Sequence, residues 1–152
     1  IEDAAQAISS FYTSNGITRP LGTFGDLATF SFHETKNISC GEGGLLVVNN
    51  EKLVRRAEII WEKGTDRSAY FRGEVDKYGW VDIGSSYLPS EFNAAVLYAQ
   101  LEKLDWIQKI RLRIWNNYFL GLETWAIQNG VRMPIIPKYA SNNAHMFYLV
   151  FR

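Results

Sequence analysis

Short apolar runs alternate with longer stretches in which apolar residues recur every three or four positions. The runs at 28–32 and 44–48 have the length of strands and are bounded by Gly, Asn and Asp. In 51–63 the helical spacing predicts a helix, with Asn49-Asn50 at its N-cap and Gly64 just past its end. Strands that alternate with helices indicate an α/β layered domain.

Residues 64–87 form a polar segment that is punctuated by glycine and also carries aromatic residues. We expect a long loop here, and loops longer than ~12–15 residues inside compact domains are usually functional or disordered. The aromatic content argues against disorder. Two interpretations stay open: a functional loop, and a loop that packs against a neighbouring subunit for stability only.

A second helical pattern begins at Pro89, which we expect in the first turn of a helix, and continues for about 40 residues. A helix of that length would run ~50–60 Å, so it, or two helices joined end to end, must bridge two domains. The apolar run 147–151 predicts the first strand of another sheet. We therefore place residues 1–110 in one large domain, and residues 111–152 in the end of the bridging helix and the start of a small, incomplete domain.

Composition excludes several classes of function. The 152 residues are 47% hydrophobic, enough to bury a core. The 16 basic and 16 acidic residues leave no net charge, which argues against a nucleic-acid partner. No run approaches the ~18 apolar residues that a membrane span needs, and the single cysteine, Cys40, cannot form an internal disulfide. We therefore expect a cytoplasmic protein without a membrane partner. Because the chain opens on Ile1 and closes on a strand-like run, we also expect it to be part of a longer protein.

The residues with the clearest chemistry surround Lys36. This lysine lies between the strand-like Ile1-Glu2-Asp3 and the glycine-rich Gly41-Glu42-Gly43-Gly44. An amine between a carboxylate and a glycine turn suits pyridoxal phosphate, whose aldehyde must form a Schiff base and whose ring nitrogen must stay protonated. Taken alone, a lysine beside a turn is more often a solvated surface group. The glycine run is not a dinucleotide fingerprint, and the separated His and Cys residues give no metal-binding pattern.

The motifs around this lysine resemble, in order and spacing, those of the sugar aminotransferases that act on nucleotide-linked keto-sugars. They are Glu2-Asp3-Ala4-Ala5-Gln6-Ala7, Gly22-Thr23-Phe24-Gly25-Asp26, Phe30-Ser31-Phe32-His33 with Lys36-Asn37, and Gly41-Glu42-Gly43-Gly44. Later motifs resemble one subgroup, the dTDP-4-amino-4,6-dideoxygalactose transaminases: Glu62-Lys63-Gly64-Thr65-Asp66-Arg67, Asp82-Ile83-Gly84-Ser85-Ser86-Tyr87-Leu88 and Asn143-Ala144-His145-Met146-Phe147-Tyr148. The resemblance implies the C-terminal half of the large domain of a fold type I pyridoxal phosphate aminotransferase. This half is a mixed sheet with flanking helices, followed by the bridging helix and the start of a small α/β domain.

The resemblance assigns cofactor roles to four residues. It implies that Lys36 forms the Schiff base and carries the proton during transamination, while Asp3 pairs with the pyridinium nitrogen. It also implies that Gln6 contacts the cofactor ring and that Ser31 binds the phosphate. From the residues alone, Asp3 is better explained as the cap of a helix starting at Ala4, with Gln6 on the same side of that helical turn. Ser31, at the end of a predicted strand, is also better explained from the residues alone as a turn former.

Three further candidates are weaker. Ser86 stands where many relatives have an asparagine that reaches the cofactor phosphate of the neighbouring subunit, and its hydroxyl is a candidate replacement. His145 matches a small-domain segment that faces the active site in the family, and we retain it with His33 as a candidate substrate contact. A lone histidine is more often structural than catalytic, so that alternative stays open for both.

The activity implied by the resemblance is the transfer of an amino group from L-glutamate to C4 of a dTDP-4-keto-6-deoxyhexose. It would serve synthesis of a surface glycan, such as lipopolysaccharide or enterobacterial common antigen, in an intact protein that is a homodimer. Two alternatives remain. A non-catalytic remnant would persist as a folded or oligomerising module, since the N-terminal half of the family fold, with its phosphate loop, has no counterpart here. A nucleotide-sugar binding protein would bind without turnover.

Overall fold

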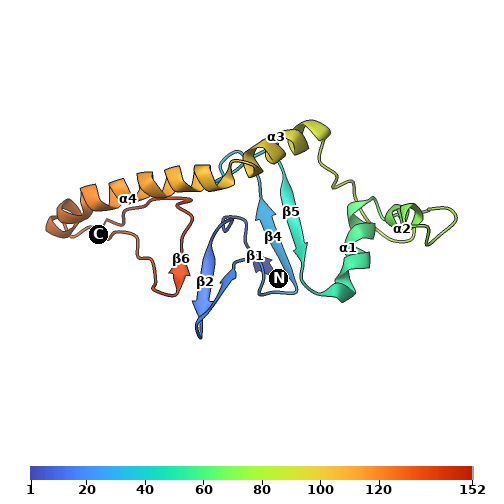
Figure 1. The fold of residues 1–152 in the computed structure, drawn as a ribbon, viewed down its shortest axis with the longest axis horizontal. Helices are drawn as coiled ribbons and strands as arrows, with labels where there is room; N and C mark the ends of the chain where they lie inside the picture. The colour runs from blue at the N-terminus through green and yellow to red at the C-terminus, as the bar shows by residue number, and fades with distance from the viewer. Residues whose placement is uncertain (152) are drawn as a thin grey trace.

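The computed structural model describes residues 1–151 as an elongated mixed α/β molecule, in which two small sheets lie beside a pair of end-to-end helices (Figure 1). The elements, in chain order, are β1 (Glu2–Asp3), β2 (Phe11–Ser14), β3 (Ile17–Pro20), β4 (Leu27–Ser31), β5 (Gly44–Val48), the 3₁₀ turn η1 (Glu51–Leu53), α1 (Val54–Trp61), α2 (Arg67–Phe71), α3 (Glu91–Leu101), α4 (Leu104–Gln128) and β6 (Ala140–Ser141). The α/β fold class predicted from the sequence is confirmed.

The first sheet has the strand order β1-β4-β5. β1 runs parallel to β4, with Asp3 opposite Thr29, and β4 runs antiparallel to β5, with Ser31 opposite Gly44. The strands predicted at 28–32 and 44–48 are therefore confirmed as β4 and β5. Because parallel strands end at the same edge of a sheet, Asp3 and Ser31 both lie at the carboxyl edge.

The second sheet, with the order β3-β2-β6, has no counterpart among the predicted elements. Asn15 and Gly16 form the two-residue hairpin turn between β2 and β3, both with positive φ, at 50° and 77°. β6 adds to the other side of β2 and so joins the C-terminal part of the chain to the hairpin. The helix considered after Asp3 does not form, because residues 4–9 are turns that lead into this hairpin.

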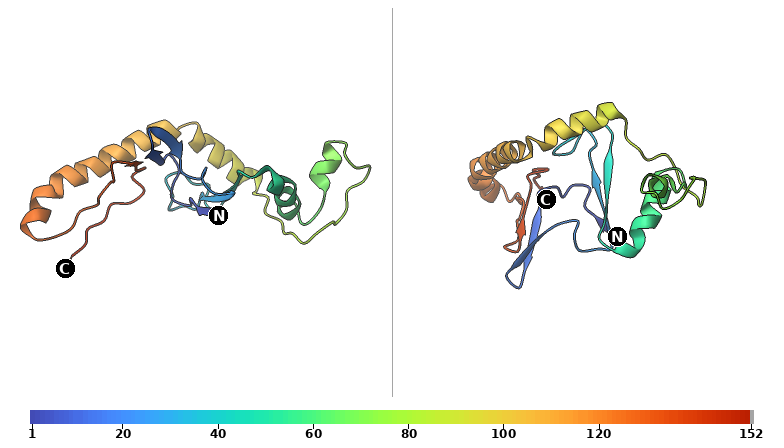
Figure 2. Two further views of the ribbon diagram at one scale, coloured as in Figure 1. Left: turned by 90° about the horizontal axis from the view of Figure 1, so that it is seen from below. Right: turned by 45° about the vertical axis from the view of Figure 1, so that its right-hand side comes forward.

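The bridging pattern forms two helices, one of the two predicted alternatives. α3 and α4 are separated at Glu102-Lys103. Pro89 was expected in the first turn of α3, but it precedes the N-cap, Ser90. The Ser90 hydroxyl accepts a hydrogen bond from the Asn93 N–H at 3.2 Å. The C-terminal segment returns along α4 (Figure 2), where the indole Nε1 of Trp115 donates to the Met146 carbonyl at 3.1 Å.

Four local predictions need correction. The predicted strand at 147–151 is wrong, since the backbone there forms only an isolated bridge between Arg132 and Val150. The predicted loop 64–87 contains a short helix, α2. Asn50 does cap the first turn after β5, but that turn is the 3₁₀ segment η1 rather than the α-helix. The residue just past the cap of α1 is Lys63, with Gly64 one position later.

The buried core lies beneath the turn that carries Lys36. Phe32, Ile38 and Cys40 form its centre. Partly buried residues of the N-terminal turns, of β4 and of the helices α3 and α4 pack around it: Ile8, Phe30, Leu97, Leu104 and Ile107. This packing attaches the turn to α3 and α4. No helix among the described residues combines the length and apolar character needed to cross a bilayer. The domain boundary near residue 110 falls inside α4 and stays a prediction.

Candidate active site

The carboxyl edge of the first sheet presents a carboxylate and a hydroxyl. Asp3 is exposed, and its Oδ1 accepts a hydrogen bond from the Ala5 N–H at 3.1 Å. Ser31 is half-buried, and its Oγ accepts from the His33 N–H at 3.3 Å. Ser31 therefore stabilises a local turn, as its alternative interpretation expected, whereas Asp3 stabilises a turn and not the helix that its alternative interpretation expected. Each also keeps acceptor capacity, and the Ser31 hydroxyl proton is free to be donated.

Lys36 lies in the turn that follows β4. Its N–H donates to the His33 carbonyl at 2.9 Å, and the two residues after it, Asn37 and Ile38, are buried with exposed fractions of 6% and 1%. The Lys36 side chain itself is half-buried. Within residues 1–151, no carboxylate lies at ion-pair distance from its ammonium group, so buried neighbours anchor the turn but no acid neutralises the amine.

The buried amide side chains of Asn37 and Gln108 meet at the backbone carbonyl of Asn143, which is also buried, and we call these three residues the amide cluster. The Nδ2 of Asn37 donates to the Gln108 Oε1 at 2.9 Å and to the Asn143 carbonyl at 2.7 Å. The Nε2 of Gln108 donates to the same carbonyl at 3.2 Å. The cluster therefore joins the lysine turn, α4 and the C-terminal segment.

Asn143 extends these connections to the N-terminal turns. Its Nδ2 donates to the carbonyls of Gln6 and Ile8 at 2.7 and 2.8 Å, and its Oδ1 accepts from the His145 N–H at 3.0 Å. The structure thus holds the Gln6 backbone in place and leaves the Gln6 side chain exposed. Segments that are far apart in sequence, around Gln6, Lys36 and His145, converge here.

His145 is the candidate most closely tied to Lys36. Its Nδ1 lies 2.9 Å from the Asn37 Oδ1. Burial lowers the pKa of His145 below its ordinary value, and the positive charges of Lys36 and Arg111 lower it further. Arg111 also donates from Nη2 to the His145 carbonyl at 3.0 Å. The ring is therefore neutral at neutral pH.

The structure does not bring His33 and Ser86 into this group. The Nδ1 of His33 contacts the Thr35 hydroxyl at 2.9 Å and its Nε2 lies 3.5 Å from Glu42, so its contacts are within its own loop. Ser86 forms an isolated bridge with Glu62, just past the end of α1, and it is exposed. α1 follows β5 in the chain and lies on the other side of it from β4 (Figure 1).

The donor set fits pyridoxal phosphate. The turn and sheet edge offer a primary amine, a carboxylate able to pair with a protonated ring nitrogen, and a hydroxyl able to donate to a phosphate. Within the described part of the chain, no group of three or more His, Cys, Asp or Glu residues is arranged so that it could hold a metal ion.

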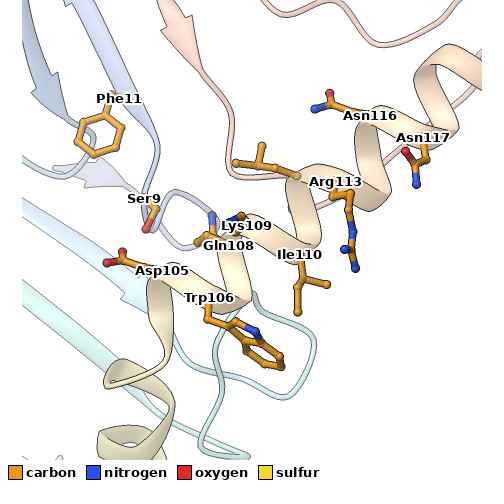
Figure 3. A pocket seen from close by; sticks show the side chains of 11 residues that line it. Ser9, Phe11, Asp105, Trp106, Gln108, Lys109, Ile110, Arg113, Asn116 and Asn117 are labelled. Carbon is orange, nitrogen blue, oxygen red and sulfur yellow. The ribbon is translucent and has the colours of Figure 1, made fainter.

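A cavity of ≈ 990 Å³ lies elsewhere, between α4 and the segment that leads into the hairpin. Ser9 and Phe11 face Gln108 and Lys109 across it (Figure 3). None of the predicted site residues lines this cavity, and it shares only Gln108 with the amide cluster. We therefore do not assign it to the amine chemistry.

Glu2 is a residue whose role the sequence reasoning missed. Its carboxylate accepts hydrogen bonds from the backbone N–H groups of Gly22, Phe24 and Gly25, at 2.6, 3.0 and 3.4 Å. Burial alone would raise the pKa of Glu2, but these hydrogen bonds and the charge of Arg19 leave it below the ordinary value. The signal was present in the sequence, because a glycine-punctuated loop exposes N–H groups that can surround an anion. The amide cluster, by contrast, left no local signal.

Comparison with known proteins identifies the family of the chain. The model of the DegT/DnrJ/EryC1/StrS aminotransferase family matches residues 1–152. An uncharacterized protein of Methanocaldococcus jannaschii is 31% identical over 156 residues, which cover 99% of this chain and 38% of that protein. The structure of DesV from S. venezuelae is 29% identical with a TM-score of 0.76, covering 96% of this chain and 35% of DesV.

A putative sugar aminotransferase of Streptococcus pneumoniae shares the fold, with a TM-score of 0.77 at 19% identity over 97% of this chain and 36% of that one. It has been solved in its PLP form and its PMP form, the two forms of the pyridoxal cofactor. The chain therefore spans little more than a third of the length of the relatives that it matches.

Proposed function

Because the chain belongs to the DegT/DnrJ/EryC1/StrS aminotransferase family, whose members depend on pyridoxal phosphate, we propose that it carries the lysine half of a transaminase active site. The observation that supports this most is the convergence of the Lys36 turn, the Gln6 turn and His145 on one amide cluster. A surface lysine without a function would not need neighbouring residues that make buried contacts with the far end of the chain.

The lysine turn and the sheet edge together supply the cofactor contacts in this proposal. When bound, pyridoxal phosphate supplies an aldehyde that takes up an amino group and a ring that withdraws electrons from the adjacent carbon. Lys36 holds the cofactor through its amine and, as a free amine, accepts and returns a proton. Asp3 keeps the ring nitrogen protonated by its negative charge, and Ser31 donates its hydroxyl to the phosphate.

The remaining candidates surround the reacting groups. Gln6 contacts the cofactor ring, and His145 contacts the substrate. Ser86, which lies at the end of α1 away from the sheet edge, serves the phosphate site of a neighbouring subunit, so the active protein is a homodimer. The contacts of His33 with Thr35 and Glu42 favour a role in holding the lysine turn over a role in substrate binding.

The substrates we propose are L-glutamate as amino donor and a dTDP-4-keto-6-deoxyhexose as acceptor at C4, within surface polysaccharide synthesis. Support comes from the subgroup motifs at 62–67, 82–88 and 143–148. Two of these segments carry Ser86 and His145, the residues that we place toward the phosphate and the substrate.

Borohydride trapping tests the role of Lys36 in the protein at its natural length. Wild-type protein mixed with pyridoxal phosphate should develop a visible absorbance band, and after reduction the cofactor mass should be found on the peptide that contains Lys36. Lys36→Ala should lose both signals, whereas Lys109→Ala, which removes an exposed lysine on α4, should keep them. An adduct trapped equally well in Lys36→Ala would refute the assignment.

The same preparation separates the alternatives. A non-catalytic remnant would give no band at any cofactor concentration. A sugar-nucleotide binding protein would bind dTDP-sugars with an affinity that does not change when the cofactor is removed. Amino transfer from L-glutamate, followed by mass spectrometry of the sugar nucleotide, identifies the acceptor.

A further inference from the structure

Asn37 directly follows the lysine and contacts His145. It is buried, with 6% of its surface exposed, and all of its amide atoms have partners. A half-satisfied buried amide would be costly, so this side chain has one preferred orientation.

The partners of Asn37 determine which end of its amide is the oxygen and which is the NH₂ group. The Asn143 carbonyl lies 2.7 Å from one end and is a backbone oxygen that can only accept, so that end must be the NH₂ group. The other end is therefore the carbonyl oxygen, and it faces the Nδ1 of His145 at 2.9 Å. Since a carboxamide oxygen cannot donate, Nδ1 must carry the proton.

A neutral imidazole with its proton on Nδ1 has a lone pair on Nε2. Within residues 1–151, Nε2 of His145 has no hydrogen-bond partner. The charged groups near the ring are Lys36 and Arg111, both cations, and together with burial they keep the pKa of His145 below its ordinary value. A second proton on the ring is therefore disfavoured, and Nε2 stays an acceptor at neutral pH.

We propose that Asn37 is a positioning residue that fixes His145 as the Nδ1–H tautomer and so presents Nε2 as a hydrogen-bond acceptor. An acceptor recognises a hydroxyl or an amine of the substrate, and it would repel a phosphate or a carboxylate. The direction of Nε2 toward a substrate rests on the proposed function, but the tautomer is a property of the protein alone.

Nitrogen NMR of the cofactor-free protein tests the tautomer without any activity measurement. With ¹⁵N-labelled histidine and the natural-length protein at neutral pH, His145 should show a protonated Nδ1 and an unprotonated Nε2. The His145→Gln variant assigns its signals. In Asn37→Leu, which removes the acceptor, the protonated population should shift toward Nε2, the form that free imidazole side chains prefer.

Asn37→Asp is the conservative variant, because a carboxylate keeps an acceptor at Nδ1. It should retain the Nδ1–H tautomer and, by adding an opposite charge, raise the pKa of His145 by about 1–3. A wild-type His145 with its proton on Nε2, or a tautomer unchanged in folded Asn37→Leu, would overturn the proposal. If Asn37→Leu does not fold, an unchanged pKa in Asn37→Asp overturns it instead. A confirmed tautomer combined with failed borohydride trapping at Lys36 would refute the proposed function and leave this inference standing.

Discussion

The carboxylate of Glu2 organises the loop at Gly22–Gly25, and Glu2→Gln is the substitution that isolates this effect. Glutamine has nearly the same shape but offers one carbonyl oxygen in place of two carboxylate oxygens. It can keep the bond from Gly22, at 2.6 Å, but it then places an NH₂ group against the N–H of Phe24, at 3.0 Å. The bond from Gly25, at 3.4 Å, is long and contributes little.

The charge-assisted hydrogen bond from the Phe24 N–H is thus lost, and two donors, this N–H and the glutamine NH₂, face each other instead. Hydrogen bonds to charged groups contribute about 1.5–3 kcal/mol, and Glu2 is only half-buried, so we expect a loss of about 2 kcal/mol in the free energy of unfolding. Urea unfolding at pH 7, followed by tryptophan fluorescence, measures this loss. The matched control is Glu123→Gln, which removes an exposed carboxylate on α4 and should change stability by less than about 0.5 kcal/mol.

The pH dependence gives an independent check on the same carboxylate. Because the folded-state pKa of Glu2 lies below the ordinary value of 4.5, its stabilisation is present above that value and is lost as the pH falls through the folded-state pKa. The gap between wild type and Glu2→Gln should therefore close in acid. Equal stabilities of Glu2→Gln and Glu123→Gln at pH 7, or a gap that stays constant to acid pH, would refute the role of the charge.

Two further substitutions test how the turn after α1 and the C-terminal segment are held. Gly64 has φ +78°, and an added Cβ would collide with the Asp82 carbonyl. Gly64→Ala should therefore lower the free energy of unfolding by about 3 kcal/mol in urea. Gly79→Ala, where an added Cβ meets no atom, should lower it little. Equal losses would show that the turn relaxes. Trp115→Phe removes the hydrogen bond to the Met146 carbonyl. It should lower the free energy of unfolding by about 1 kcal/mol and speed amide hydrogen exchange around Met146. Trp106→Phe, at a side chain that is 63% exposed, should change neither. Unchanged exchange in Trp115→Phe would contradict the anchoring role.

Elements with a strong local pattern could be predicted from the sequence, and elements set by distant contacts could not. β4 and β5 follow from apolar runs with clear boundaries. The hairpin from Phe11 to Pro20 was missed although Asn15-Gly16 is a strong turn signal, because its strands are mostly polar and exposed. The strand expected at 147–151 failed for the opposite reason: its apolar residues pack against α4 instead of pairing, as Phe147 does with Trp115.

The same distinction between local pattern and distant contact applies to the candidate site residues. Lys36, Asp3 and Ser31 lie within motifs that are continuous in sequence, so a family resemblance was enough to select them. Asn37 and Asn143 pair across 106 residues, and an asparagine carries no local mark of such a partner. His145 was selected by resemblance, but its link to Asn37 required coordinates.

The distance along the chain between Asn37 and Asn143 also sets an order of events during translation. The lysine turn leaves the ribosome before the carbonyl that receives its buried amide, which is made 106 residues later. Until then Asn37 and Gln108 lack the acceptor they share, and closing so long a loop is a slow step in folding. A nascent or prematurely terminated chain therefore holds Lys36 in a loosely fixed turn, and the buried contacts of that turn are complete only once synthesis has passed His145.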